Sequence, residues 1–219
     1  MSRRRLVLLS LGCSLLALSF VPVGVSPLHG EPTAVLAVEL GRTGGVVVED
    51  NFDREQLGDK WKVAKGSWTL ADGALLGQEV ATDKHAAVAT IGGSHRNSVI
   101  RFRFQLNGAK QFALSLNKQR GHLFRVVISE NGLTLSLDKD KSDPESKPQV
   151  LARAQGVIEP NHWHTLQLEM LGDRVLARTD SGLKVAGQHE SLDCDKPGYR
   201  FVVGGESVRI DDLVISALR

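Results

Sequence analysis

The sequence predicts an all-β protein: one domain of two packed antiparallel sheets, preceded by an export signal. Short segments in which apolar and polar residues alternate recur along the chain, and turn dipeptides separate them. No long segment shows the period of an amphipathic helix. A single apolar run follows three arginines at the N-terminus, which is typical of a cleavable signal.

The signal is predicted over residues 1–30, with cleavage between residues 30 and 37. Arginines occupy positions 3–5, residues 6–21 are apolar apart from small residues, and prolines at 22 and 27 end any helix. A transmembrane helix needs about 20 apolar residues, and this run is shorter and charged on one side only. We therefore expect no transmembrane segment and a mature protein that is secreted or periplasmic.

Charge and cysteine content argue against a nucleic-acid-binding protein and against a fold held by disulfides. Residues 1–30 hold three of the 27 Lys and Arg residues and none of the 25 acids, so the mature chain has one acid in excess. Nucleic-acid binding is not expected, because it needs a clustered basic patch. Cys194 is the one cysteine after the signal, so the fold must depend on its core and not on an internal disulfide.

The strands follow from alternation of period two, which places one face of a strand on the core and the other toward solvent. The alternation is clearest at 100–106, 112–117, 133–138 and 165–170. Segments 122–129 and 199–203 are more continuously apolar, as in strands covered on both faces.

Turns are predicted at Asp72-Gly73, Asn131-Gly132, Gly172-Asp173 and Ser181-Gly182. The charged, proline-containing stretch 139–149 is predicted to be a mobile surface loop within the domain. We place that domain at residues 46–217.

Five short motifs carry a family resemblance. They are DNFD at 50–53, WKV at 61–63, GSWTLADGAL at 66–75, NHWHT at 161–165 and VRIDDLVI at 208–215. In this order and spacing the chain resembles the 3-keto-disaccharide hydrolase domain family, often labelled family-16 glycoside hydrolase-like. The resemblance implies a concanavalin A-like jelly roll and a role in carbohydrate processing. Trp61, Trp68 and Trp163 lie in these motifs, and their apolar neighbours predict that all three are core residues.

Ordinary glucanase chemistry is not supported by the acids. A retaining glycosidase needs two carboxylates about 5–5.5 Å apart, which jelly-roll glucanases supply from a Glu-x-Asp-x-Glu strand. The nearest set here is Glu49, Asp53 and Glu55, whose spacing of four and then two does not fit.

Histidines offer a different chemistry. His85 follows Lys84 before an apolar strand, and His122 opens the strand that contains Arg125. A neutral histidine with a cation beside it could abstract the acidic proton next to a keto group and stabilise the enolate. The candidate catalytic residues are therefore His85 and His122, and the candidate ligand-binding residues are Lys84, Asn117, Arg125 and Glu206. The alternative is that both histidines are exposed strand-end residues.

Two further features remain open. Asp50 and Asp53 near the first strand could meet Asp211 and Asp212 in the last and bind Ca²⁺ through oxygen ligands, or they could be solvated. No other cofactor is expected. A polar stripe over two adjacent strands is either a solvated face or the floor of a binding groove, and it comprises Arg101, Arg103, Gln105, Ser115 and Asn117.

Two functional classes follow. The first is a secreted jelly-roll domain that binds carbohydrate or a cell-surface partner without ordinary glycosidase catalysis. The alternative is an enzyme that cleaves 3-keto-glycosides by histidine-assisted proton abstraction. Aromatic residues make up only 5% of the chain, which limits sugar-stacking surface. The sequence carries no signal for an oligomeric state.

Overall fold

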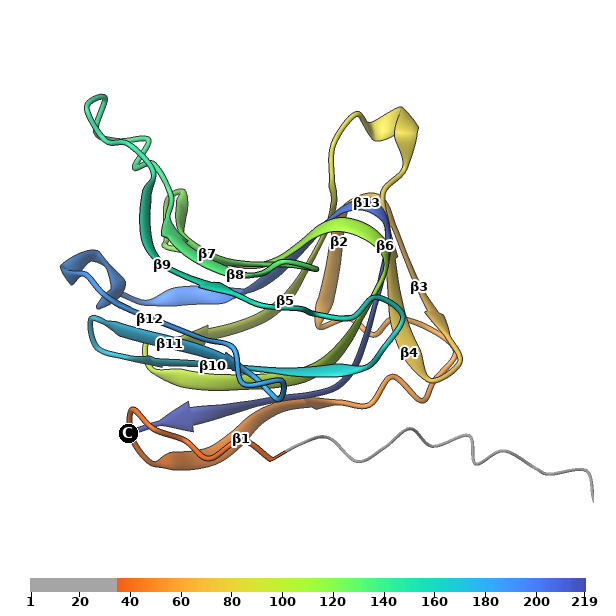
Figure 1. The fold of residues 1–219 in the computed structure, drawn as a ribbon, viewed down its shortest axis with the longest axis horizontal. Coiled ribbons are helices and arrows are strands. Elements are labelled where there is room, and N and C mark those ends of the chain that lie inside the picture. Colours follow the sequence, from red (N-terminus) through yellow and green to blue (C-terminus); the bar gives the residue numbers. More distant parts are fainter. Residues whose placement is uncertain (1–34) are drawn as a thin grey trace, which may run out of the picture. The chain divides into compact units, whose positions relative to one another are not determined.

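Two long strands, β6 (Ser98–Asn117) and β13 (Lys196–Leu218), organise the fold. The computed structural model describes residues 35–219, so the predicted signal peptide lies outside the described residues. The two strands pair antiparallel along most of their length, from Tyr199 opposite Leu116 to Ala217 opposite Ser98. Both strands bend, so that each contributes one half to an upper layer and the other half to a lower layer (Figure 1).

The upper sheet contains seven strands in the order β9-β8-β7-β6-β13-β5-β2, all antiparallel. Besides β6 and β13 these are β2 (Trp61–Lys65), β5 (Ala87–His95), β7 (His122–Ser129), β8 (Gly132–Leu137) and β9 (Gln149–Gln155). The alternating and apolar segments predicted as strands are the ones that form this sheet and its partner.

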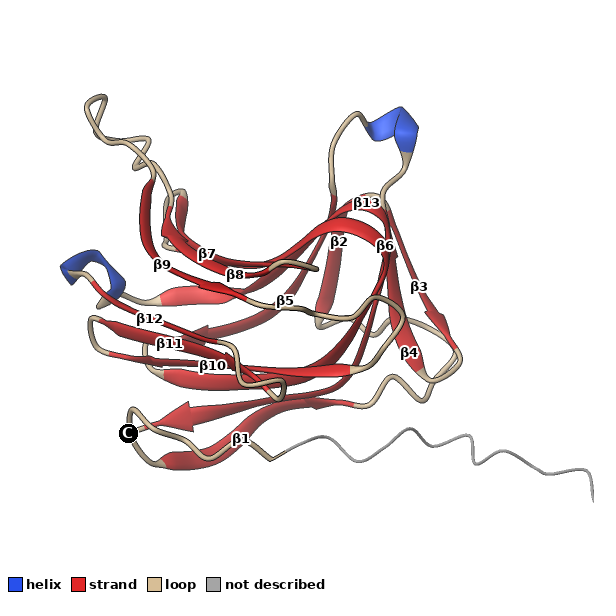
Figure 2. Ribbon diagram, in the orientation of Figure 1, coloured by secondary structure: helices blue, strands red, loops and turns tan. Residues whose placement is uncertain are grey.

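The lower sheet follows the order β12-β11-β10-β6-β13-β4-β3, and β1 pairs with the last part of β13. Its other strands are β1 (Thr43–Asp50), β3 (Ser67–Ala71), β4 (Ala74–Gln78), β10 (His164–Leu171), β11 (Arg174–Thr179) and β12 (Lys184–Gln188). Figure 2 shows the two short 3-10 turns, η1 (Ala81–Asp83) and η2 (Glu190–Leu192), beside the strands and loops. The predicted all-β sandwich of two antiparallel sheets is confirmed. Within residues 35–219 no helix is long and apolar enough to cross a membrane.

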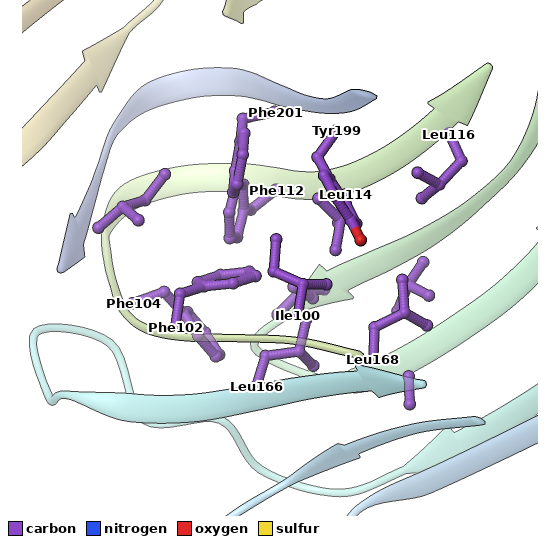
Figure 3. Close-up of a cluster of buried hydrophobic side chains, with 14 of the residues drawn as sticks. Ile100, Phe102, Phe104, Phe112, Leu114, Leu116, Leu166, Leu168, Tyr199 and Phe201 are labelled. Atoms are coloured by element: carbon purple, nitrogen blue, oxygen red, sulfur yellow. The ribbon is translucent and has the colours of Figure 1, made fainter. Parts of the chain in front are cut away.

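The core fills the space between the two layers (Figure 3). Large side chains from both halves of β6 meet those of β13 and β10, each at most 1% exposed: Ile100, Phe102, Phe104, Phe112, Leu114, Leu116, Leu166, Leu168, Tyr199 and Phe201. Burying one such side chain contributes about 1.5–3 kcal/mol. The apolar side chains of the alternating segments therefore hold the two sheets together by packing between them.

The three tryptophans do not share one environment. Trp61 and Trp68 are 6% and 7% exposed, which confirms them as core residues. The prediction for Trp163 is wrong: it is half-buried on the outer side of the lower sheet. The guanidinium groups of Arg103 and Arg209 lie 4.7 and 5.6 Å from its ring centroid, so cation–π stacking and not core packing holds it.

Residues at the start of the described chain cover the outer face of the lower sheet. The backbone N–H groups of Glu39 and Leu40 both donate to Oε2 of Glu169 at 2.8 Å. Oε1 of Glu169 accepts from Gln167 at 2.9 Å and from Arg178 at 3.1 Å. Glu169 is 0% exposed as a result, although its alternation in β10 predicts a solvent-facing residue.

Candidate binding face

The outer face of the upper sheet is concave. Figure 1 shows its strands curving upward toward both ends, with the 138–148 loop at one end and the η1 turn at the other. The 138–148 loop contacts the loop between β6 and β7 through an ion pair of 2.6 Å between Lys118 and Asp140. Hydrogen bonds from Lys118 and Ser142 hold the pKa of Asp140 well below its usual range.

A continuous row of outward-facing residues crosses this face at right angles to the strands. The pairing register places Lys62 opposite Thr90, Thr90 opposite Arg200, Arg200 opposite Ser115, Ser115 opposite Arg125, and Arg125 opposite Ser136. Neighbouring strands lie about 4.8 Å apart, so the Cα atoms of Arg200 and Arg125 lie about 10 Å apart with Ser115 between them. Residues brought from distant parts of the sequence thus form one polar row.

The centre of the row contains polar groups without partners. The Ser115 hydroxyl is fully buried and makes no hydrogen bond, and the residue is 2% exposed. The guanidinium of Arg200, half-buried, makes no hydrogen bond or ion pair to any residue of the described chain. Burial and the nearby charge of Arg125 lower the pKa of Arg200. The half-buried cation of Arg200 is therefore available to a ligand on this face, and the buried Ser115 hydroxyl has no partner in the protein.

Arg125 has one protein partner. Its guanidinium forms an ion pair with Oδ1 of Asp138, which follows β8 directly. Oδ2 of Asp138 is buried and accepts no hydrogen bond. The ion pair satisfies Oδ1 of Asp138 and part of the Arg125 guanidinium, and it leaves Oδ2 of Asp138 without a donor beside the row.

His122 completes the group at the loop end of the face. Its Nδ1 lies 2.9 Å from Oδ1 of Asn117 and donates to it, because an amide oxygen only accepts; Nε2 is then the unprotonated nitrogen of the neutral ring. Burial, and after it the positive charge of Arg200, lower the pKa of His122. We name these six residues, Ser115, Asn117, His122, Arg125, Asp138 and Arg200, the arginine cluster.

Three of the predicted site residues thus come together, and three do not. His122, Asn117 and Arg125 belong to the arginine cluster, whereas Lys84, His85 and Glu206 lie toward the other end of the sheet. His85 lies two residues before Ala87, which pairs with Val203 of β13. His122 pairs with Asn117, and the residue before Asn117 pairs with Tyr199 of β13. Val203 and Tyr199 are four residues apart along β13, or about 13 Å. The predicted joint site of His85 and His122 is therefore wrong. His85 is exposed, with Nδ1 against the Ala86 carbonyl, and Glu206 is exposed at the bend of β13.

The predicted polar stripe is divided by the bend in β6. Arg101, Arg103 and Gln105 are on its half in the lower sheet, and Ser115 and Asn117 are on its half in the upper sheet. The stripe therefore faces two ways, and only its second part reaches the arginine cluster.

Two members of the cluster were not predicted from the sequence. Arg200 is the one charged residue of the apolar segment 199–203, and that interruption was a usable signal. Asp138 ends an alternating strand and gave no signal of its own, because only the β7–β8 pairing brings it to Arg125.

The acids proposed for calcium have contacts with other residues of the protein. Asp50 accepts hydrogen bonds from Arg54, the Trp61 Nε1–H and the Phe52 N–H. Asp211 and Asp212 lie 3.8 and 3.7 Å from the Arg103 guanidinium. Burial raises the pKa of Asp211. Within residues 35–219 no three His, Cys, Asp or Glu side chains are grouped as metal ligands, so calcium stays a prediction from the sequence.

The charged residues of the upper sheet are of one sign. Its strand segments, including residues 111–117 of β6 and 196–204 of β13, contain no Asp or Glu. Their charged residues are Lys62, Lys65, Arg125, Arg153, Lys196 and Arg200. A glycosidase of the two-carboxylate type needs acids on this face, and none of its strands supplies one.

Two curved antiparallel sheets that share two bent strands define a concanavalin A-like jelly roll, as expected. No protein-family model matches the chain, and no curated protein matches it either. The family-16-like fold is therefore shown by structural likeness alone, and no match supports the 3-keto-disaccharide hydrolase family itself.

Solved structures share the fold at low identity. The carbohydrate-binding module CBM66 from Bacillus subtilis aligns with a TM-score of 0.58 and 11% identity, covering 72% of this chain and 96% of the module. SCLam, a non-specific endo-β-1,3(4)-glucanase of family GH16, gives 0.57 and 12%, covering 80% of this chain and 91% of its own. The laminarinase from Rhodothermus marinus gives 0.57 and 11%, covering 83% and 100%.

Proposed function

We propose that this protein is exported and binds carbohydrate on the concave face of the upper sheet, without ordinary glycosidase catalysis. The observation that carries the proposal is the row of outward polar side chains from Lys62 to Ser136, with the unpartnered Ser115 hydroxyl and Arg200 guanidinium at its centre. Sugar hydroxyls both donate and accept, so they match such a surface. CBM66, which has a similar fold, is named a carbohydrate-binding module, and this supports the choice.

The charge of the concave face disfavours ordinary glycosidase catalysis. A two-carboxylate mechanism has no acids on the strands of the face, where Arg125 and Arg200 stand instead. We expect no release of reducing sugar from any polysaccharide that binds.

The test is a pair of blocking variants. Ser136→Trp puts a bulky side chain beside Arg125 on the concave face, and Thr69→Trp is the matched control on the exposed edge strand β3. We expect Ser136→Trp to weaken binding to an immobilised polysaccharide panel by about tenfold or more, or about 1.4 kcal/mol, and Thr69→Trp to leave it unchanged. Equal binding by both variants, or steady release of sugar, would contradict the proposal.

The alternative enzyme has one observation in its favour. His122 is oriented by Asn117, its free Nε2 and lowered pKa suit a neutral general base, and Arg125 and Arg200 could stabilise an enolate. This site excludes His85. Cleavage of a 3-keto-disaccharide, but not of its unoxidised parent, would support the enzyme if His122→Ala lowers the rate by about 10²–10⁴-fold and His85→Ala does not. No cleavage of either sugar would reject it.

A further inference from the structure

The arginine cluster is unusually cationic for this chain. The whole chain carries 27 basic and 25 acidic residues, yet every charged residue in the strands of the upper sheet is basic. In the cluster, Arg125 and Arg200 face the single acid Asp138. Since one carboxylate cannot neutralise two guanidinium groups, the centre of the face holds one uncompensated positive charge.

The unpartnered atoms define what a ligand must offer. A buried polar group without a hydrogen bond costs about 1–3 kcal/mol, so Ser115 Oγ and Asp138 Oδ2 each favour a ligand that satisfies them. Both atoms are buried, so a ligand reaches them only when the side chains beside them move aside; Ser115 can then donate to an anion between the arginines, and Asp138 Oδ2 can accept from a hydroxyl. The guanidinium of Arg200 presents paired N–H donors that match the two oxygens of a carboxylate.

A neutral sugar would satisfy Asp138 and leave Arg200 half-buried beside Arg125 without an anion. A simple anion would satisfy Arg200 and leave Asp138 Oδ2 without a donor. A sugar ring that carries both a carboxylate and free hydroxyls can satisfy both the Arg200 guanidinium and Asp138 Oδ2, since the Cα atoms of the two arginines lie roughly 10 Å apart.

We propose that the saccharide bound here is acidic, and that a uronic acid residue places its carboxylate over Ser115 between Arg200 and Arg125. Its ring hydroxyl donates to Asp138 Oδ2. This inference rests on the carbohydrate binding proposed above and specifies the class of sugar.

The experiment compares acids with their neutral esters. Oligosaccharides of galacturonate, mannuronate and glucuronate are titrated against the full-length protein by calorimetry, each beside its methyl ester, with a neutral β-1,3-glucan hexaose as a further probe. We expect at least one free acid to bind about tenfold or more tightly than its ester, and its affinity to fall with added salt.

Variants assign the effect to the cluster. Arg200→Gln should abolish the preference for the acid, Arg200→Lys should retain part of it, and Arg174→Gln, an equal charge change on the exposed surface of β11, should leave it intact. Unchanged melting temperatures check that the variants fold.

Equal affinity for every acid and its ester, or an acid preference that survives Arg200→Gln, overturns the inference. Binding of the neutral hexaose alone overturns the inference and leaves the proposed function standing; binding of no saccharide contradicts both.

Discussion

Each outer face of this sandwich has a carboxylate paired with an arginine, yet the two carboxylates are satisfied to different extents. On the lower sheet Glu169 accepts four hydrogen bonds from the protein itself, two of them from the backbone at residues 39 and 40. On the upper sheet Ser115 and one oxygen of Asp138 are buried without any partner. The comparison teaches that a buried polar residue is informative for binding when its partners are missing, because a satisfied one is part of the fold.

Glu169→Ala should have the largest effect on stability. Removing the carboxylate leaves Arg178, Gln167 and two backbone N–H groups without their buried acceptor, which costs about 3–5 kcal/mol. Chemical denaturation measures the loss, and saccharide affinity at low temperature should be unchanged. Glu145→Ala, in an exposed loop, is the control and should change stability by less than about 0.5 kcal/mol.

Trp163→Ala tests whether the stack on the lower face is a surface feature. Cation–π contacts at a partly exposed site contribute about 1 kcal/mol, so we expect a loss of that order. Trp61→Ala, in the core, should cost about 3–5 kcal/mol. Equal losses for the two variants, measured by thermal unfolding, would show that Trp163 belongs to the core after all.

Ser115→Ala reverses the pattern expected for Glu169. It removes a buried hydroxyl that has no partner, so stability should stay within about 1 kcal/mol of wild type or rise. Saccharide affinity should fall by about 2–10-fold, the value of one hydrogen bond. A clear loss of stability with unchanged affinity would place Ser115 among the structural groups and remove the contrast between the faces.

The smallest expected effect is a pH dependence from His122. Its pKa is lowered in the folded protein from the ordinary value of 6.5, so the unfolded chain binds the proton more readily. Stability from this group is therefore present above about pH 6.5 and is lost as the pH falls through the folded pKa. Denaturation midpoints at about pH 7.5 and about pH 5 should differ less in His122→Gln than in wild type. His85→Gln, at an exposed residue, should retain the full difference.

The sequence predicted the fold well because its signals are local. Alternation in 100–106 and 165–170 is a property of neighbouring residues, and it correctly places Phe102 and Leu166 in the core. The same local pattern failed for Glu169, because a segment some 130 residues earlier covers it. Local alternation states which way a side chain points within its sheet, and not what lies above it.

The site was predicted only in part for the same reason. Arg125, Asn117 and His122 are close in sequence and were grouped correctly. Arg200 joins them through the pairing of β6 with β13, which no local signal encodes. His85 was added by chemical type alone, and the register separates it from His122.

The continuity of β13 through both layers has a consequence for how the chain reaches this structure. The last strand pairs with β5, β6, β4 and β1, so neither layer is complete until the C-terminal residues are available. Pairings this distant in sequence make folding slow. If the protein is exported as proposed, such a delay favours its passage across the membrane, because the 23 residues of β13 complete both layers of the sandwich.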